Sequence, residues 1–393
     1  MTATEALVDG LCEQRFAGVR RAFEENLAQY GDIGAAVAVT IDGVPVIDLW
    51  GGYMDRERTR RWEQYSLVTV YSTTKGMTTI CAHRLVEQGL LDVDAPVSRY
   101  WPEFAQAGKA DVPVRMLLTH SVGLPSVSDP LPEGAIYDWE VMTEALAKQA
   151  PLWEPGTTHG YHGLTFGWLV GEVVKRVSGK SLGTFFRDEV ALPLGLDTHI
   201  GLAPEHDGRV ATMYAFEPTP EMAAEMKQRR EEMQATMLPA VVETQGNVTI
   251  PPGPQGHNSE AWRRAEIPAA NGHSDARSLA RVYGALSRGG EVDGVRVLES
   301  ETIERAIEQQ VGGRDESLGM ETRFALGFWL SRDGGMGPGP RAFGHPGAGG
   351  SVGFADPDAK VGFGYVMNQM KPGLLVESTG RRLIDALYAA LQV

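Results

Sequence analysis

Cysteine is nearly absent from the chain: 393 residues include only two, Cys12 and Cys81. Two cysteines that lie so far apart in the sequence exclude a disulfide framework and any CxxC metal or redox motif. Long apolar runs are also missing, since none approaches the roughly 18 residues of a membrane-spanning helix. The first thirty residues are rich in charge and contain no apolar stretch typical of a secretory signal. We therefore expect a cytoplasmic protein with no membrane partner.

Positive charge is scarce as well. Lys and Arg number 36 against 51 Asp and Glu, which gives a net charge of −15. An acidic chain lacks the basic surface that nucleic acids and anionic membranes attract, so no nucleic-acid partner is expected. With 42% apolar and 22% charged residues, the composition is typical of a globular protein of one large or two ordinary domains.

What the chain does contain is a hairpin pattern near each end. Asp42-Gly43, a dipeptide typical of two-residue hairpin turns, separates two β-rich runs, and the polar segment 356–360 separates two more. These four runs are 34–41, 44–50, 351–355 and 361–368. Hairpins at both ends predict one antiparallel sheet assembled from N- and C-terminal parts.

Helical periodicity occupies much of the rest of the chain. It is seen over 16–30, 71–90, 164–177, 276–288 and 374–391. We therefore predict an α/β protein of the α+β type, an antiparallel sheet flanked by helices with an added helical subdomain. The discontinuous sheet domain would comprise 1–70 and 275–393, the mainly helical subdomain 71–274, and the active site would lie at their interface.

A candidate nucleophile stands at the start of one predicted helix, in Ser72-Thr73-Thr74-Lys75. Positions i and i+3 share a helix face, so the Lys75 amine can reach the Ser72 hydroxyl. The N–H of a serine at the first turn can also stabilise an oxyanion. A lysine acts as a base only if burial or a neighbouring cation lowers its pKa. The same residues also fit a polar helix start with a solvated lysine.

Two glycine-flanked segments are further candidates. Tyr161, between Gly160 and Gly163, could act as a general acid or base, or could simply pack in a tight turn. In 344–351, GHPGAGGS, the glycines allow the backbone to approach a ligand closely, and an N–H there could be a second oxyanion donor. A plain bend at a sheet edge is the alternative.

Together these segments resemble serine hydrolases of the class C β-lactamase and DD-peptidase superfamily, and within it the family VIII carboxylesterases. The likeness extends over most of the chain and includes three further segments. They are LLTHSVGL at 117–124, WEPG at 153–156 and GWLVG at 167–171. The resemblance implies the β-lactamase/transpeptidase-like fold.

The resemblance also implies roles for individual residues. Ser72 would be the nucleophile, Lys75 its base and Tyr161 a proton shuttle. The N–H groups of Ser72 and Ala348 would form the oxyanion hole. No cofactor is implied.

Two departures from the lactamase pattern bear on the substrate. The chain has Gly163 where lactamases have Asn, and His345-Pro346-Gly347 where they have Lys-Thr-Gly. With its usual pKa of about 6.5, His345 would be mostly neutral at pH 7 to 8 and would attract a carboxylate weakly.

We therefore predict a carboxylesterase that acts on small-molecule, short-chain esters, with His345, Gly347 and His162 at substrate-binding positions. The oligomeric state is open. A β-lactamase or a peptidase/amidase on the same fold, or a non-catalytic scaffold, are the alternatives.

Other patterns have simpler interpretations. Ser351 lies in a G-x-S-x-G sequence, but the last histidine precedes it, so the residue order of an α/β-hydrolase triad cannot be completed. His159 and His162 have no third ligand nearby in sequence, so no metal site is expected. Four methionines share one helical face and either cover the acyl site or pack against the core. They are Met222, Met226, Met233 and Met237.

Overall fold

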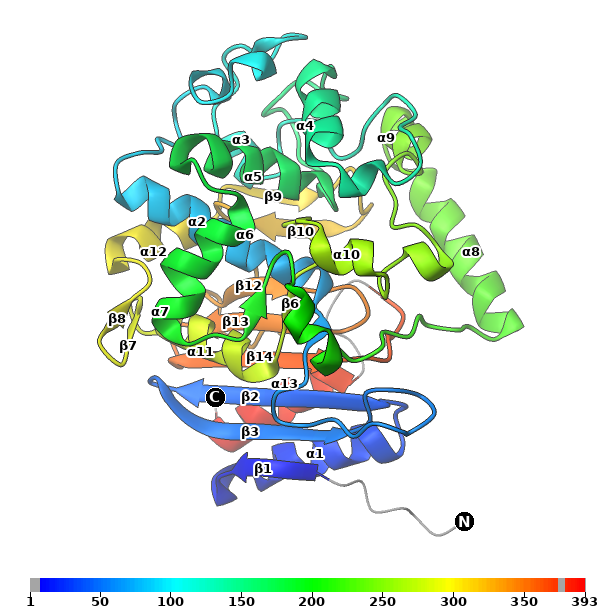
Figure 1. Cartoon of the computed structure of the whole chain (residues 1–393), viewed down its shortest axis with the longest axis vertical. Coiled ribbons are helices and arrows are strands. Elements are labelled where there is room, and N and C mark those ends of the chain that lie inside the picture. Colours follow the sequence, from blue (N-terminus) through cyan, green and yellow to red (C-terminus); the bar gives the residue numbers. More distant parts are fainter. Residues whose placement is uncertain (1–7, 374–378, 393) are drawn as a thin grey trace.

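A nine-stranded antiparallel sheet forms the centre of the protein, in the order β1-β3-β2-β14-β13-β12-β11-β10-β9 (Figure 1). It belongs to a computed structural model that describes residues 8–373 and 379–392. Its strands are β1 (Val8–Cys12), β2 (Gly34–Ile41), β3 (Val44–Gly52), β9 (Val311–Arg314), β10 (Glu321–Phe324), β11 (Trp329–Leu330), β12 (Phe343–Pro346), β13 (Val352–Asp356) and β14 (Val361–Met367).

Both predicted hairpins are present. Strands β2 and β3 pair antiparallel, with Ile41 opposite Val44 across the Asp42-Gly43 turn. Strands β13 and β14 pair with Asp356 opposite Val361. The prediction of one sheet built from both chain ends is confirmed, because β2 and β14 are direct neighbours. The predicted fold class is therefore correct, while the division into domains at 70 and 275 stays a prediction.

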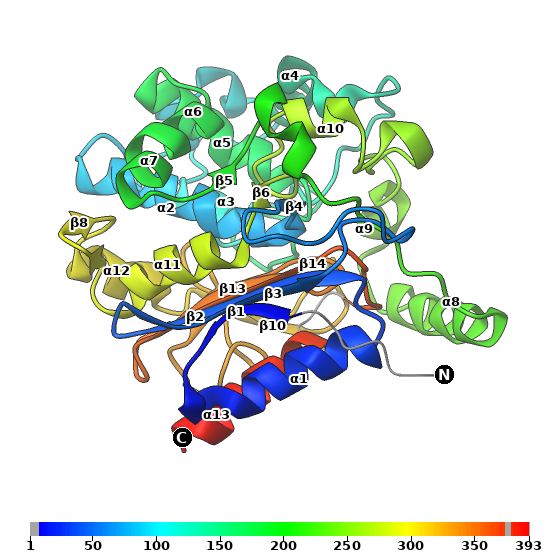
Figure 2. The same cartoon turned by 60° about the horizontal axis from the view of Figure 1, so that its bottom comes forward.

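Helices cover both faces of the sheet. Figure 2 shows α1 and α13 side by side on one face, most of the other helices layered on the opposite face, and α8 at the side. The helices are α1 (Ala17–Ala28), α2 (Thr74–Glu87), α3 (Arg115–Leu118), α4 (Trp139–Lys148), α5 (Thr165–Ser178), α6 (Leu182–Phe186), α7 (Leu192–Leu194), α8 (Pro220–Gln234), α9 (Pro239–Thr244), α10 (Glu260–Arg264), α11 (Ala276–Ser287), α12 (Ser300–Ile307) and α13 (Thr379–Leu391). The predicted helices are confirmed in α1, α2, α5, α11 and α13, except that 374–378 lies outside the described residues.

Helix α11 lies directly on the central strands of the sheet. A Cβ atom at Gly362 would be 2.2 Å from Gly284 N, and one at Gly364 would be 2.2 Å from Ala276 O. Backbone therefore meets backbone here, and the two glycines of β14 allow it. This close contact fixes the height of the helical layer above the sheet.

A small three-stranded sheet, not predicted, ties the helical layer together in the order β4-β6-β5. Its strands are β4 (Val68–Thr69), β5 (Thr198–His199) and β6 (His273–Ser274), and a separate two-stranded ribbon pairs β7 (Glu291–Val292) with β8 (Val295–Arg296). Strand β4 leads into α2, so this small sheet sets the start of that helix.

Helix α8 extends away from the body of the protein (Figures 1 and 2). None of its residues is buried, and Met222 and Met226 are 39% and 44% exposed. Met237 instead belongs to a small apolar cluster with Trp153 and Val241, and Met233 packs against this cluster. Of the four methionines, two are therefore exposed to solvent and two pack against other side chains. Along residues 8–373 and 379–392, no helix is both long enough and apolar enough to cross a membrane.

Candidate active site

The candidate nucleophile lies where a short strand turns into a helix. Val70 N–H donates to Gly272 O at 2.8 Å after the end of β4, and Ser72 follows in a 3₁₀ turn. Tyr71 adopts a φ of +45°, which is uncommon for a residue with a side chain. This sharp bend leaves Ser72 7% exposed at the N-terminal end of α2.

Lys75 is fully buried beside this serine. Its Nζ atom lies 3.3 Å from Ser72 Oγ, 2.7 Å from Gly163 O and 3.0 Å from Ala269 O. Burial holds the pKa of the Lys75 amine well below its usual value. A neutral amine has two N–H groups for the two carbonyls and a lone pair for the Ser72 hydroxyl. The surroundings of Lys75 therefore suit a base.

Tyr161 lies against both residues. Lys75 Nζ is 4.7 Å from the centre of the Tyr161 ring. Burial raises the pKa of the Tyr161 phenol, while its contact with the Ser72 hydroxyl acts in the opposite direction with smaller effect. The phenol is therefore protonated at neutral pH and can donate its proton. The structure thus brings Ser72, Lys75 and Tyr161 into one buried cluster.

Two side chains that the sequence analysis did not identify hold the backbone around Tyr161. Tyr161 N–H donates to both carboxylate oxygens of the buried Asp315, each at 3.0 Å. His162 N–H donates to His120 Nδ1 at 3.1 Å, and the His120 carbonyl accepts the N–H of Gly160. His120 belongs to a segment that the resemblance singled out without a role. Asp315 lies 154 positions from Tyr161, and no local pattern marks it.

The polar contacts of His162 lie within the fold, and its predicted substrate contact stays a prediction. His162 is fully buried, its Nδ1–H donates to Gly160 O at 2.6 Å, and its Nε2 accepts Leu124 N–H at 3.0 Å. Both ring nitrogens are thus occupied by backbone groups, and burial lowers the pKa of His162 to about 3. This neutral histidine stabilises the loop that carries Tyr161.

The glycine-rich segment packs directly on the turn that carries Ser72. A Cβ at Gly347 would lie 2.3 Å from Val70 O and 2.1 Å from Ser351 Oγ, so only glycine fits. The N–H of Gly347 donates to Ser351 O at 2.7 Å, and its predicted substrate contact stays a prediction. Ala348 comes next and is half-buried; its N–H donates to no acceptor within the described part of the chain. Ala348 therefore offers an available N–H close to the Ser72 turn.

His345 faces Tyr161 and not an open binding surface. It is 1% exposed, and its ring packs against the rings of Tyr161 and Trp329. Its Nε2 lies 3.5 Å from the Tyr161 hydroxyl. Burial, and then the nearby Lys75 amine, hold the pKa of His345 well below its usual value. The predicted substrate contact of His345 stays a prediction, and these surroundings favour a neutral imidazole at this position.

Two other residues discussed in the sequence analysis, Ser351 and His159, bond to neighbouring parts of the fold. Ser351 is buried and its hydroxyl donates to Val70 O at 2.8 Å, so it supports the Ser72 turn. His159 Nε2 lies 2.8 Å from Thr322 Oγ1. Among residues 8–373 and 379–392, no three His, Cys, Asp or Glu side chains gather as a metal site would require.

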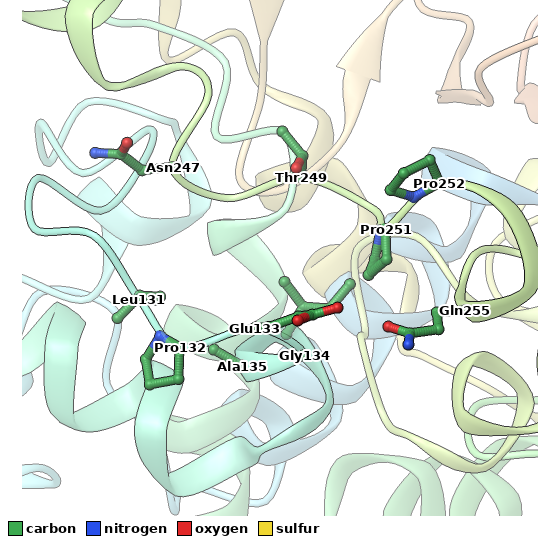
Figure 3. A pocket seen from close by; sticks show the side chains of 11 residues that line it. Leu131, Pro132, Glu133, Gly134, Ala135, Asn247, Thr249, Pro251, Pro252 and Gln255 are labelled. Carbon is green, nitrogen blue, oxygen red and sulfur yellow. The ribbon is translucent and has the colours of Figure 1, made fainter.

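A pocket of about 480 Å³ opens elsewhere in the helical layer, between loop 131–136 and segment 247–255 (Figure 3). Proline, leucine and isoleucine side chains line it together with Glu133, Asn247 and Gln255. None of the residues of the Ser72 cluster lines this pocket, so it is distinct from the candidate active site.

A buried serine hydroxyl next to a neutral amine, a protonated phenol and an available backbone N–H can form and break an acyl-serine bond. This fold and this cluster define a serine hydrolase. The chain belongs to the beta-lactamase family, whose family profile matches residues 19–388.

Individual relatives agree with this assignment. The chain is 36% identical to "Esterase/beta-lactamase LipL" of Mycobacterium tuberculosis, over 94% of this chain and 85% of that protein. Among solved structures, it is similar to "a family VIII carboxylesterase", with a TM-score of 0.88 and 40% identity over 98% of this chain and 99% of that one. It is also similar to a penicillin-binding protein homolog from Caulobacter crescentus, with a TM-score of 0.85 and 38% identity over 98% and 99% of the two chains.

Proposed function

We propose that the protein is a carboxylesterase that hydrolyses short-chain esters through an acyl-enzyme on Ser72. The hydrogen-bonding of Lys75 is the observation that carries this proposal. Two backbone carbonyls, of Gly163 and Ala269, receive N–H groups of the amine, and the remaining direction meets Ser72 Oγ. A lysine held in this way accepts the serine proton without first having to lose its own.

Acylation follows from this arrangement. Lys75 takes the Ser72 proton as Oγ attacks the ester carbonyl, and the carbonyl oxygen becomes negatively charged. The N–H groups of Ser72 and Ala348 stabilise this oxyanion. When the C–O bond to the alcohol breaks, Tyr161 donates its proton to the departing oxygen and regains one from the Lys75 ammonium.

Deacylation repeats these steps with water. A water molecule loses a proton to Lys75 as it attacks the acyl-serine carbonyl, and the same two N–H groups stabilise the new oxyanion. The proton then returns to Ser72 Oγ as the acid product leaves. No metal or cofactor is needed for either half-reaction.

The charge state of the cluster favours a neutral ester as substrate. Lys75, Tyr161 and His345 all have pKa values shifted toward their uncharged forms by burial. Esterase names among the relatives support the same substrate class, including "Esterase EstB" of Burkholderia gladioli, 30% identical over 48% of this chain. A penicillin or cephalosporin carries a carboxylate, which a neutral His345 does not attract.

Labelling with a fluorophosphonate tests the nucleophile. The wild-type chain should gain one adduct by intact mass, and peptide mapping should place it on Ser72. Ser72→Ala should lose both the adduct and ester turnover, with a fall in kcat of about 10³- to 10⁶-fold.

Ser351→Ala is the matched control, because Ser351 is a second buried serine next to the same turn. It should keep the adduct on Ser72. An adduct on Ser351, or a Ser72→Ala enzyme that retains about a tenth of wild-type kcat/KM, far above the residue expected without a nucleophile, would contradict the proposal. A wild-type enzyme that prefers a cephalosporin to a p-nitrophenyl ester would favour the β-lactamase alternative.

A further inference from the structure

The Tyr161 hydroxyl has two polar neighbours, and only one of them is part of the proposed proton path. One is Ser72, whose hydroxyl lowers the pKa of the phenol. The other is His345, whose Nε2 lies 3.5 Å from the phenol oxygen. Hydrogen bonds of this length are typical of active sites without substrate and shorten in the reacting complex.

The hydrogen-bonding of the second ring nitrogen defines the tautomer of His345. Nδ1 lies 2.7 Å from Pro346 O, and a carbonyl oxygen can only accept, so Nδ1 carries the proton. A neutral imidazole with a protonated Nδ1 has a bare lone pair on Nε2. His345 therefore presents an acceptor, and not a donor, to the Tyr161 hydroxyl.

The packing around the ring keeps this acceptor in place. The His345 ring centre is 5.4 Å from that of Trp329 at an interplanar angle of 88°, and 5.7 Å from that of Tyr161. The ring is 1% exposed, and burial together with the nearby Lys75 disfavours a charge on it. His345 therefore stays neutral while Lys75 gains and loses its proton.

We propose that His345 is a positioning residue that accepts the Tyr161 O–H and so keeps Tyr161 protonated, as the acid that serves the departing alcohol. This inference rests on the proposed esterase function. A neutral acceptor favours the protonated phenol, whereas a lysine at the same place would favour the phenolate. Lys75 is then the only base of the cluster, and Tyr161 acts in one direction, as a proton donor.

The proposal predicts a dependence on the leaving group. A p-nitrophenolate leaves without a proton because the nitro group stabilises its charge. An ethoxide does not leave a tetrahedral intermediate without one, so cleavage of an ethyl ester depends on the Tyr161 proton. Ethyl butyrate and p-nitrophenyl butyrate form the same acyl-enzyme, and their kcat/KM values therefore compare only the acylation step.

The test compares His345→Gln with His345→Asn, two amides that differ by one methylene. Gln places its amide oxygen near the position of Nε2 and keeps an acceptor for Tyr161, whereas the Asn oxygen falls short of it. We expect His345→Asn to lower kcat/KM for ethyl butyrate about tenfold more than for p-nitrophenyl butyrate, as loss of one hydrogen bond would. His345→Gln should keep the wild-type ratio of the two values.

Two controls separate this role from a structural one. His83→Asn removes another buried imidazole, bonded to Leu326 O, and should affect both esters equally. In a Tyr161→Phe background, His345→Asn should cause no further ester-selective loss, because the group it acts on is gone.

Equal losses on both esters for His345→Asn, or a His345→Gln enzyme that behaves like His345→Asn, would overturn the proposal. Turnover by Ser72→Ala would instead overturn the esterase mechanism itself.

Discussion

Lys75 is a buried amine, and no carboxylate is among the groups that shift its pKa. Because burial disfavours the charged amine, its pKa lies well below the usual lysine value. Activity requires the neutral form, so kcat/KM for p-nitrophenyl butyrate should rise with pH through this lowered pKa and level off below the pH at which an exposed lysine titrates. A pH profile of kcat/KM, which reports the free enzyme, checks this.

Lys75→Arg is the sharpest variant at this position. A guanidinium stays protonated at any accessible pH and cannot accept the Ser72 proton. We expect Lys75→Arg to be as inactive as Lys75→Met, and raising the pH should restore neither. An Arg variant that keeps wild-type activity at neutral pH would show that the positive charge, and not the base, is what the site needs.

Gly347 is a second position at which we expect a small substitution to lower activity, because there is no room for a Cβ atom. A methyl group there would lie 2.3 Å from Val70 O and would push the 344–351 segment away from the Ser72 turn. Loss of one oxyanion donor typically lowers kcat by about 10²- to 10³-fold, and we expect Gly347→Ala to fall in that range. Gly18→Ala, where a Cβ meets nothing within 4 Å, is the control and should retain full kcat.

At the residue scale, local spacing was enough to identify the candidate nucleophile and its base, but not the residues that hold them in place. Ser72 and Lys75 are one helical turn apart, so their contact could be predicted from sequence. Asp315 could not, because it acts on Tyr161 through a backbone N–H from a strand turn 154 positions away. The burial of His345 and Gly347 could not be predicted either, since sequence does not show which side of a segment is buried.

Helix α11 begins with a buried N-cap whose charge opposes folding. Asp275 accepts Ser278 N–H at 2.7 Å, and burial raises the pKa of the Asp275 carboxyl to about 6. Since the folded state binds this proton more tightly than the unfolded one, the free energy of unfolding falls as pH rises from about 4 to 6. Asn caps helices as well as Asp and carries no charge.

We therefore expect Asp275→Asn to be more stable than wild type at pH 8, by on the order of 1 to 3 kcal/mol, and equal to it near pH 4. Urea unfolding at the two pH values measures the difference. Asp138→Asn is the control, because Asp138 caps α4 at the surface through Val141 N–H. A pH-independent difference at Asp275 would contradict the argument.

At the element scale, the hairpins and five of the helices were predictable from their patterns, whereas the two-residue strands were not. The hairpin of β2 and β3 was predicted from its Asp42-Gly43 turn and its β-rich runs, and the structure contains this hairpin. Strands β4, β5 and β6 are two residues long each and carry no pattern, yet they set the start of the helix that holds Ser72. Helix α8 carries methionines, yet none of its residues is buried, and Met222 and Met226 are exposed.

The two ends of the molecule are joined through α1 and α13. Asn26 is fully buried; its Nδ2 donates to Thr379 O at 3.0 Å, and its Oδ1 accepts from Arg382 at 3.2 Å. Asn26→Ala should lower the free energy of unfolding by about 1 to 3 kcal/mol, because buried groups lose their partners. Gln29→Ala, at an exposed position of the same segment, should change it little.

Helix α2, which begins just after Ser72, lies on the other face of the sheet from α1 and α13 (Figure 2). The Asn26→Ala enzyme should therefore keep wild-type kcat/KM at temperatures where it is folded. A parallel loss of activity and stability would mean that the sheet transmits changes from one face to the other.

At the scale of the whole molecule, the sequence predicted that both chain ends share one sheet but not the strand order. Hairpins identify neighbours that are close in sequence, as in β13 and β14. The pairing of β2 with β14, and the run from β12 to β9, depend on which apolar faces meet across the folded chain.

The pairing of β2 with β14 has a consequence for synthesis on the ribosome. Seven of the eight β2 residues are buried in the folded protein. Until β14 has been synthesised, one edge of β2 has no strand to pair with. Ile41 and Val361 are about 320 positions apart, so at roughly 5 to 20 residues per second the partner emerges only some 15 to 65 seconds later. Throughout that interval the nascent chain carries an apolar strand with an open edge, a form that invites association between neighbouring nascent chains. Factors that shield nascent chains during this time should therefore determine the yield of folded enzyme more strongly than its final stability does.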